Sequence, residues 1–248
     1  MFELNYILFI IMDIVQNTAN ASLIIQVITG IIDFYILTLN IPKPYLILRE
    51  LLILEFIVQI VEGSFYIWLT TSFNSIENIT PYRYYDWYIS TPTMLITFCI
   101  YLIYLRNQEK KTLSDNDRID TTDNFFKIIK QNIETLTYII ILNAMMLTFG
   151  LMNELNMMDT NTAVLGGFIP FILMFFSIYD NYAKHSKLGI TIFKYFSGIW
   201  SLYGVAALMS YQWKNAFYNI LDLFAKNFFG IYLAYILWIV STKKIPVS

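Results

Sequence analysis

The amino-acid sequence predicts an all-α integral membrane protein, built as a bundle of seven transmembrane helices. Hydrophobic residues make up 57% of the chain, charged residues only 14%, and the mean hydropathy is +0.56. The hydrocarbon core of a bilayer needs about 20 apolar residues per helix. Runs of this kind occur at about 18–40, 46–71, 82–104, 132–153, 162–181, 190–210 and 215–241. They leave room for one domain, residues 1–248.

The N-terminal residues have two interpretations. Tyr6–Val15 is apolar, and it is followed by the polar run Gln16–Asn20. A signal peptide is disfavoured, because the segment carries Glu3 and lacks the basic residues that such peptides begin with. We expect a short interfacial helix over residues 1–16. The alternative is that the first transmembrane helix begins near Tyr6 and is kinked.

The distribution of basic residues predicts the orientation in the membrane, since short cytoplasmic loops carry the excess of Lys and Arg. Lys214 lies near the end of a segment on one side of the bundle. The opposite side has thirteen basic residues: Lys43, Arg49, Arg106, Lys110, Lys111, Arg118, Lys127, Lys130, Lys184, Lys187, Lys194, Lys243 and Lys244. The N-terminus is therefore expected outside the cell and the C-terminus in the cytoplasm.

One connection is strongly polar and is expected to be a cytoplasmic loop over residues 105–131. Acidic and basic residues are mixed from Arg106 to Asn124. A solvated loop is the simpler interpretation, and a surface that docks a partner is the alternative.

Enzyme chemistry has little support in this sequence. The single histidine, His185, lies in a basic loop, and the single cysteine, Cys99, lies in an apolar segment. Together they cannot build a His/Cys metal site or a Cys-His pair. We expect no enzymatic activity, no metal ion and no nucleic-acid partner.

Charged residues inside the apolar segments carry the functional information. A lysine at the centre of a membrane helix costs about 2.5–3.5 kcal/mol, so Lys226 calls for a functional reason and a partner. Asp222 precedes it by one turn, and the third segment contributes Arg83 and Asp86. Asp86, Ser90 and Thr97 share one face of that segment. The four charged side chains would form a balanced quartet.

Two interpretations of this quartet remain. Buried ion pairs can serve only to fix the packing of helices. A ligand pocket is favoured, because aromatic and hydroxyl side chains accompany the charges, namely Trp87, Thr91, Trp200 and Tyr203.

These residues form motifs that resemble those of microbial (type 1) rhodopsins. The third segment reads Arg-Tyr-Tyr-Asp-Trp-x-x-Ser-Thr-Pro over 83–92, the sixth reads Trp-Ser-Leu-Tyr over 200–203, and the seventh reads Asp-Leu-Phe-Ala-Lys over 222–226. The three motifs occur in the family's order and spacing, and the resemblance covers nearly the whole chain.

The resemblance implies a bound all-trans retinal. Lys226 would form the protonated Schiff base, with Asp86 as the primary counterion and proton acceptor and Asp222 as the second counterion. Arg83 and Ser90 match the motif beside them. The polyene would be lined by Trp87, Thr91, Met94, Met146, Gly150, Trp200 and Tyr203.

Some pocket positions depart from the family's commonest pattern. Gly204 stands where many relatives have proline, and Ala207 stands where an aromatic residue is frequent. A looser sixth helix and a shifted colour would follow. We expect Phe168 and Met174 to be ordinary core or lipid-facing residues.

The second segment carries a polar stripe, Glu55, Gln59 and Glu62, on one face over about 10 Å of helix. Acidic residues that line a pore attract cations. The stripe also resembles the second helix of rhodopsins from giant viruses of algae, a group that includes light-gated cation channels. The alternative is that Glu55 and Glu62 are protonated and hydrogen-bonded to neighbouring helices, or form an oligomer contact.

The sequence therefore favours a retinal-binding photoreceptor that acts as a light-gated cation channel. A light-driven outward proton pump is the alternative, although Thr97 stands where a pump needs a carboxylic proton donor. A sensory photoreceptor with a membrane partner is the third hypothesis. We expect a multi-pass protein of the plasma membrane or a host-cell membrane, in contact with lipid, transporting cations or protons, and assembled as a homo-oligomer.

Overall fold

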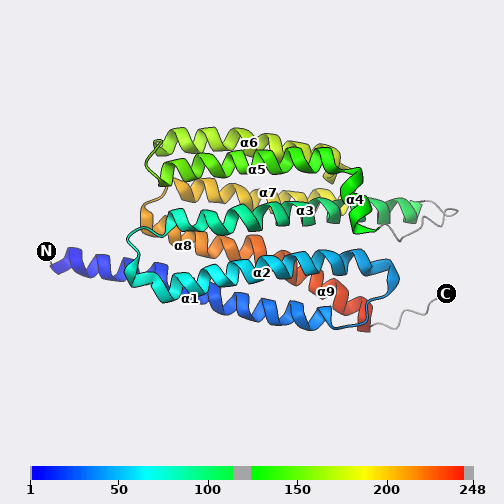
Figure 1. Cartoon of the computed structure of the whole chain (residues 1–248), viewed down its shortest axis with the longest axis horizontal. Helices are drawn as coiled ribbons and strands as arrows, with labels where there is room; N and C mark the ends of the chain where they lie inside the picture. Colours follow the sequence, from blue (N-terminus) through cyan, green and yellow to red (C-terminus); the bar gives the residue numbers. More distant parts are fainter. Residues whose placement is uncertain (1, 114–123, 243–248) are drawn as a thin grey trace.

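The computed structural model describes residues 2–113 and 124–242, and within them the secondary structure is helical (Figure 1). Short 3-10 turns occupy 43–45, 73–75 and 183–185. The longer elements are α1 (Phe2–Leu37), α2 (Leu46–Ser72), α3 (Thr80–Leu113), α4 (Phe125–Gln131), α5 (Ile133–Glu154), α6 (Thr160–Asn181), α7 (Lys187–Ala207), α8 (Tyr211–Asp222), the π-helical segment η4 (Leu223–Asn227) and α9 (Phe228–Thr242).

The predicted seven-helix bundle is confirmed. The consecutive elements α8, η4 and α9 run on as one rod, which is the seventh long helix, and α4 is a short helix that leads into α5 (Figure 1). Five stretches are long and apolar enough to cross a membrane, namely Ile14–Leu37, Thr80–Glu109, Ile133–Glu154, Thr160–His185 and Tyr211–Thr242. Helices α2 and α7, of 27 and 21 residues, complete the set.

The interfacial helix predicted over residues 1–16 is not a separate element. Helix α1 is continuous from Phe2 to Leu37, as in the alternative that starts the first helix near Tyr6. Its N-terminal turns extend beyond the neighbouring helix ends (Figure 1). The polar run Gln16–Asn20 therefore lies within a helix.

The loop predicted over 105–131 is also partly wrong. Helix α3 continues to Leu113, and α4 occupies Phe125–Gln131, while 114–123 lie outside the described residues. Glutamate, lysine, arginine and glutamine are good helix formers, so α3 can extend beyond its apolar stretch.

The connections alternate between the two ends of the bundle (Figure 1). The connections 38–45 and 182–186 lie at one end, together with the C-terminal end of α3 and the N-terminal end of α4; we call it the basic end because the predicted cytoplasmic lysines and arginines of the described residues gather there. Lys214 lies at the opposite end, in the first turn of α8. Arg118, Lys243 and Lys244 lie outside the described residues, as do the side chains of Lys110 and Lys111. The orientation in the membrane stays a prediction.

Side chains next to the helix ends explain where several helices begin. Asp159 accepts a hydrogen bond from the backbone N–H of Thr162 at 3.0 Å and caps α6, and Ser186 caps α7 through Gly189 at 3.0 Å. Such caps satisfy backbone donors that the first helical turn leaves free. Asn156, with a φ of 57°, makes the turn before α6, since asparagine tolerates the left-handed region.

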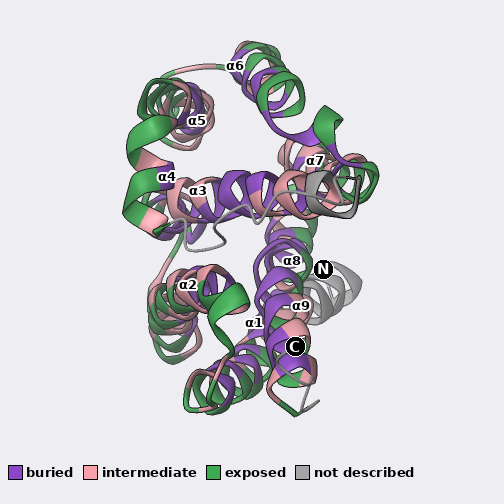
Figure 2. Ribbon diagram, turned by 90° about the vertical axis from the view of Figure 1, so that its right-hand side faces the viewer, coloured by how far each residue is buried: buried purple, intermediate pink, exposed green. Residues whose placement is uncertain are grey.

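Buried residues lie on the helix faces toward the interior of the bundle, and exposed residues lie on its outer sides (Figure 2). The largest buried cluster is apolar and includes Phe98, Phe196 and Phe229, with the Phe98 and Phe196 rings stacked at 4.1 Å. The outward apolar side chains, such as Ile31 and Leu165, are those that lipid would cover. Polar side chains are buried as well, and they form the candidate site.

Candidate functional site

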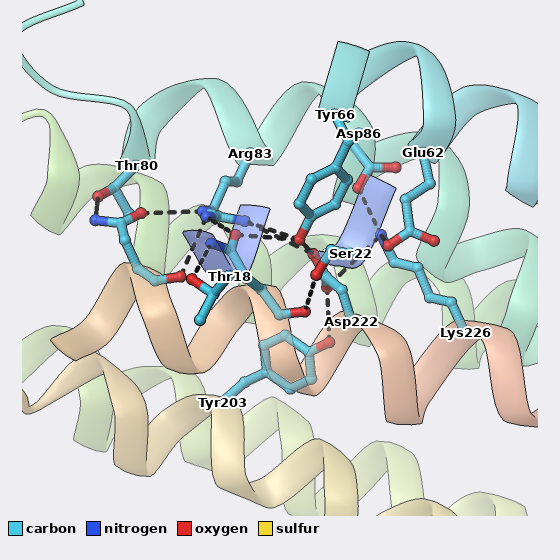
Figure 3. Close-up of polar contacts among 12 residues, drawn as sticks. Thr18, Ser22, Glu62, Tyr66, Thr80, Arg83, Asp86, Tyr203, Asp222 and Lys226 are labelled. Atoms are coloured by element: carbon cyan, nitrogen blue, oxygen red, sulfur yellow. Dashed lines mark hydrogen bonds and ion pairs between the residues drawn. The ribbon is translucent and has the colours of Figure 1, made fainter. Parts of the chain in front are cut away.

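Lys226 is held in the middle of the seventh helix by an irregular turn. It belongs to the five-residue π-helical segment η4 and is 1% exposed. Single π-helical turns within α-helices frequently occur at functional sites. The ammonium group points toward α2 and α3 rather than toward lipid (Figure 3).

Three carboxylates surround the Lys226 ammonium nitrogen, Nζ. It donates a hydrogen bond to Asp86 Oδ2 at 2.5 Å, and it lies 3.4 Å from Glu62 Oε1 and 3.7 Å from Asp222 Oδ1 (Figure 3). The sequence predicted Asp86 and Asp222 at this position. Glu62 was assigned to the polar stripe alone, so its place beside the lysine is an addition from the structure.

The side chains around Asp222 complete the predicted quartet. Asp222 accepts hydrogen bonds from the hydroxyls of Tyr66 at 2.8 Å and Tyr203 at 2.7 Å, and Arg83 Nη1 lies 3.7 Å from its Oδ2. The four residues of the predicted quartet therefore lie together, and Glu62 adds a third carboxyl group beside them.

A hydrogen-bonded network fills the bundle on the far side of Lys226 from the basic end. Arg83 donates to Asn219 Oδ1 at 2.5 Å and to Asn215 Oδ1 at 3.0 Å. Asn215 Nδ2 donates to Thr80 at 2.9 Å, and Asn219 Nδ2 donates to Thr18 of α1 at 2.9 Å. The sequence analysis missed both asparagines. Their spacing of four, three and four residues from Asn215 to Lys226 places them on one helix face and could have revealed them.

A long pocket starts at Lys226 and runs between α3, α5, α6 and α7. Its empty volume is about 910 Å³, part of it open to the surface. All seven residues predicted to line a polyene line it: Trp87, Thr91, Met94, Met146, Gly150, Trp200 and Tyr203. Arg83 and Ser90 are buried beside it but are not among the lining residues. An apolar channel that ends at a buried amine suits the retinal implied by the sequence motifs.

The rings of this pocket hold one another in place. Trp87 meets Tyr203 and Tyr218 edge to face, with ring centroids 5.6 and 5.1 Å apart. Thr91 donates to the Trp87 carbonyl at 2.6 Å and accepts from Asn143 at 2.8 Å. These contacts fix the walls before any ligand binds.

The expectation for Phe168 was wrong. It lines the pocket together with Gly204 and Ala207. A Cβ atom added at Gly204 would lie 2.5 Å from the Phe168 ring. The phenylalanine therefore fills the space that a larger residue at position 204 would need. Met174, by contrast, is fully buried in the apolar core, as expected.

A second group of polar side chains lies between α1, α2 and the seventh helix. We call it the polar row, and it comprises Gln26, Asp33, Glu55, Gln59 and Asn227. Each is at most 4% exposed, and in the described part of the chain their side-chain polar atoms meet no partner in full hydrogen-bond geometry, although Thr97 lies close enough to Glu55 to interact with it. A Cβ atom at Gly230 would lie 3.1 Å from Asp33 Oδ2 and 3.8 Å from the Glu55 Cβ, so the two acidic residues face the same glycine.

Comparison with known families gives a match over most of the chain. The sequence model of the family described as bacteriorhodopsin-like protein matches residues 15–240. A search of the curated proteins finds no match.

Several solved structures share the fold. Viral rhodopsin OLPVRII is 22% identical, with a TM-score of 0.72 over 91% of this chain and 98% of that one. The thermophilic rhodopsin from Rubrobacter xylanophilus is 18% identical, with a TM-score of 0.69 over 92% and 97%. Xanthorhodopsin, a light-driven ion pump with a dual chromophore, is 15% identical, with a TM-score of 0.66 over 93% and 94%. At these identities the similarity shows the fold.

Proposed function

This chain belongs to the bacteriorhodopsin-like family of retinal-binding, multi-pass membrane proteins, and we propose that it is a light-gated cation channel. Bound retinal supplies a change of shape driven by light. Lys226 would hold the retinal through its amine, and the pocket between α3, α5, α6 and α7 would hold the polyene. The channel activity is our inference from the polar row.

The side chains around Lys226 hold its proton in a defined place. Asp86, at 2.5 Å from Nζ, is the nearest carboxylate and would be the group that accepts this proton. Asp222 accepts hydrogen bonds from the hydroxyls of Tyr66 and Tyr203, which hold its carboxyl group in place as the second counterion. Trp87 and Trp200 orient the ligand and exclude water from the polyene.

The polar row is the observation that carries the proposal. An unsatisfied buried polar group costs about 1–3 kcal/mol, and the row contains several of them. Water or a cation along α1, α2 and α9 would satisfy these groups. The carboxyl groups of Asp33 and Glu55 give such a path a preference for cations. Polar groups inside membrane segments mark ion pathways in many membrane proteins.

The network on the far side of Lys226 closes this path in the dark. Arg83, Asn215 and Asn219 bind one another and reach Thr18 on α1 without leaving the bundle. A shift of Asp222 or Arg83 upon illumination would break these hydrogen bonds. The channel opens when the network separates and the polar row becomes continuous with the outer side.

The decisive experiment is a light-evoked current in a voltage-clamped cell supplied with retinal, recorded from negative to positive potentials under two cation gradients. We expect a current that reverses sign and whose reversal potential follows the gradient. An outward current that never reverses would contradict the channel and support a pump.

Substitution of the polar row tests the path itself. Glu55→Gln removes a carboxyl from the path and should lower the current or change its selectivity, while the pigment keeps its colour. Glu50→Gln, on the same helix but outside the polar row, is the matched control and should leave the current as it is. Equal currents in wild type, Glu55→Gln and Glu62→Gln would refute the proposed pore.

An outward proton pump is the second candidate, favoured by the direct hydrogen bond from Lys226 to Asp86. Thr97, buried on α3 and donating to the Thr93 carbonyl at 2.9 Å, supplies no carboxylic proton donor. A pump built on this site would regain its proton slowly, with a photocycle that depends on pH. A coloured protein without any current would instead favour the sensory photoreceptor.

A further inference from the structure

The ionisable groups around Lys226 would not balance one another if all of them were charged. Three carboxylates, Glu62, Asp86 and Asp222, gather around two cations, Lys226 and Arg83. All five side chains are at most 3% exposed. Full ionisation would leave one uncompensated negative charge in the interior of the bundle, which is costly without water or a further partner.

The three carboxylates differ in the donors that stabilise their charge. Asp222 accepts two tyrosine hydroxyl hydrogen bonds, and Asp86 accepts the short hydrogen bond from Lys226. The buried oxygens of Glu62 meet no donor in full hydrogen-bond geometry among the described residues, and their one nearby donor is Lys226 Nζ at 3.4 Å, a longer and weaker contact than the one Asp86 makes. Hydrogen bonds to the charged form are what favour ionisation of a buried carboxyl. Glu62 is therefore the least stabilised anion of the three.

We propose that Glu62 is a third carboxyl of the chromophore site that holds a proton in the dark, and that losing this proton shifts the colour of the pigment. The inference rests on the proposed attachment of retinal to Lys226. It concerns the dark state and does not depend on whether the protein conducts ions.

Every group that faces Glu62 is compatible with this assignment. Lys226 of the seventh helix is the one cation within 4 Å in the described residues, and the carboxylates of Asp222 and Asp86 repel a further negative charge. Tyr66 on α2 and Tyr203 on α7 also face it, and their hydroxyls donate to Asp222 instead. Gln26 on α1, near Gly63, brings no charge.

The colour follows from the charge near the Lys226 nitrogen. A negative charge there stabilises the ground state, in which the positive charge is localised on the nitrogen, and so shifts absorption to the blue. Raising the pH transfers the Glu62 proton to water and leaves one additional negative charge within reach of that nitrogen. The wild-type pigment should therefore show a blue shift in alkaline solution.

The test is a dark titration of the visible absorption maximum in wild type, Glu62→Gln and Glu55→Gln. Glutamine copies the neutral form of Glu62, so Glu62→Gln should keep the wild-type maximum at neutral pH and lose the alkaline blue shift. Glu55→Gln, a matched change of a buried glutamate two turns away, should retain that shift. A red-shifted Glu62→Gln pigment at neutral pH, or an alkaline shift that persists in it, would overturn the proposal.

An infrared titration of the wild-type pigment decides the question even if Glu62→Gln forms no pigment. Glutamate labelled with carbon-13 at its carboxyl should move a protonated-carboxyl C=O band, and this band should vanish over the pH interval of the colour change. A colour change without loss of a glutamate band would refute the assignment. A coloured protein that carries no current would refute the channel and leave this result intact, whereas colour in Lys226→Ala would refute the attachment site.

Discussion

The charged neighbours of Lys226 stabilise its ammonium group in the middle of the seventh helix. A lone ammonium group in the middle of a membrane helix is expensive, and three carboxylates within 4 Å supply the compensation. The same surroundings keep a cationic nitrogen in one position at the end of an apolar pocket. A buried amine at the end of an apolar pocket is the combination that a covalently bound chromophore requires.

Removal of this lysine should remove the colour. Lys226→Ala leaves no amine in the pocket, so retinal addition should give no absorbance band in the visible region. Membranes containing wild type and variant, compared after identical retinal addition, provide the measurement. A Lys214→Ala variant keeps Lys226 and should still form pigment; a coloured Lys226→Ala protein would contradict the assigned attachment site.

The sequence predicted two of the carboxylates beside Lys226, one on the same helix and one in a recognisable motif of α3. It did not predict the third. Asp222 stands one turn from Lys226, and Asp86 belongs to a helix with a recognisable motif. Glu62 lies on α2, and its distance from Lys226 depends on how α2 is rotated against the seventh helix. A periodic pattern shows which residues share a face, and it does not show which neighbouring side chain that face meets.

Glu154 lines the pocket and forms an ion pair with Lys214 at the end of the bundle away from the basic end. Their ion pair is 2.7 Å long, and the two side chains are 7% and 12% exposed. Lys214→Met should lower the free energy of unfolding by about 1–3 kcal/mol, since the largely buried Glu154 carboxyl group loses its hydrogen-bond donor. The midpoint temperature of pigment bleaching measures the effect.

An exposed ion pair provides the control for this prediction. Lys184 and Asp180 are 2.5 Å apart, but their side chains are 40% and 52% exposed. Lys184→Met should change stability by less than about 1 kcal/mol, because water screens such pairs. If the two substitutions lower the stability equally, the ion pair between Glu154 and Lys214 stabilises the protein no more than an exposed pair does.

The helices followed the hydropathy pattern closely in the middle of the chain and departed from it at charged or polar boundaries. Hydropathy measures transfer into lipid, whereas helix formation depends on local propensity and hydrogen bonding. Helix α1 therefore continues through Gln16–Asn20, and α3 continues to Leu113. The π-helical turn at 223–227 has no composition signal at all, because it depends on the packing around Lys226.

Helices α3 and α5 approach closely at Gly150. A Cβ atom there would lie 2.3 Å from the Tyr84 hydroxyl, and Tyr84 is itself packed against Trp87 at 5.0 Å. Gly150→Ala should therefore force Tyr84 or α5 to move and lower stability by about 1–3 kcal/mol, the usual cost of overpacking. Thermal bleaching of the pigment gives the measurement.

Gly198 of α7 is the matched control. A Cβ atom there would meet nothing within 4 Å, so Gly198→Ala should leave the bleaching temperature unchanged or raise it. Alanine is the better helix former by about 1 kcal/mol in an open helix position. A stable Gly150→Ala protein would mean that Tyr84 has room to yield.

The orientation of the whole bundle is open to a direct test. Cys99 is fully buried and the chain has no second cysteine, so an introduced cysteine would be the one accessible thiol. Met157, 67% exposed in the turn before α6, lies at the end predicted to be outside, and Lys184 lies at the basic end. A membrane-impermeant maleimide should label Met157→Cys in intact cells and label Lys184→Cys only after lysis. The reverse pattern would invert the proposed topology.

The bundle places two kinds of interior side by side. The pocket borders α3, α5, α6 and α7, and the polar row borders α1, α2 and the seventh helix, with Lys226 between them. Substitutions in the pocket can therefore change the colour of the pigment without altering the proposed ion path on the other side. Glu62 is the exception, since it continues the stripe of α2 and also faces Lys226. A substitution at this position would therefore affect both the absorption spectrum and the proposed ion path. We expect fewer substitutions to be tolerated at Glu62 than in the pocket or in the polar row.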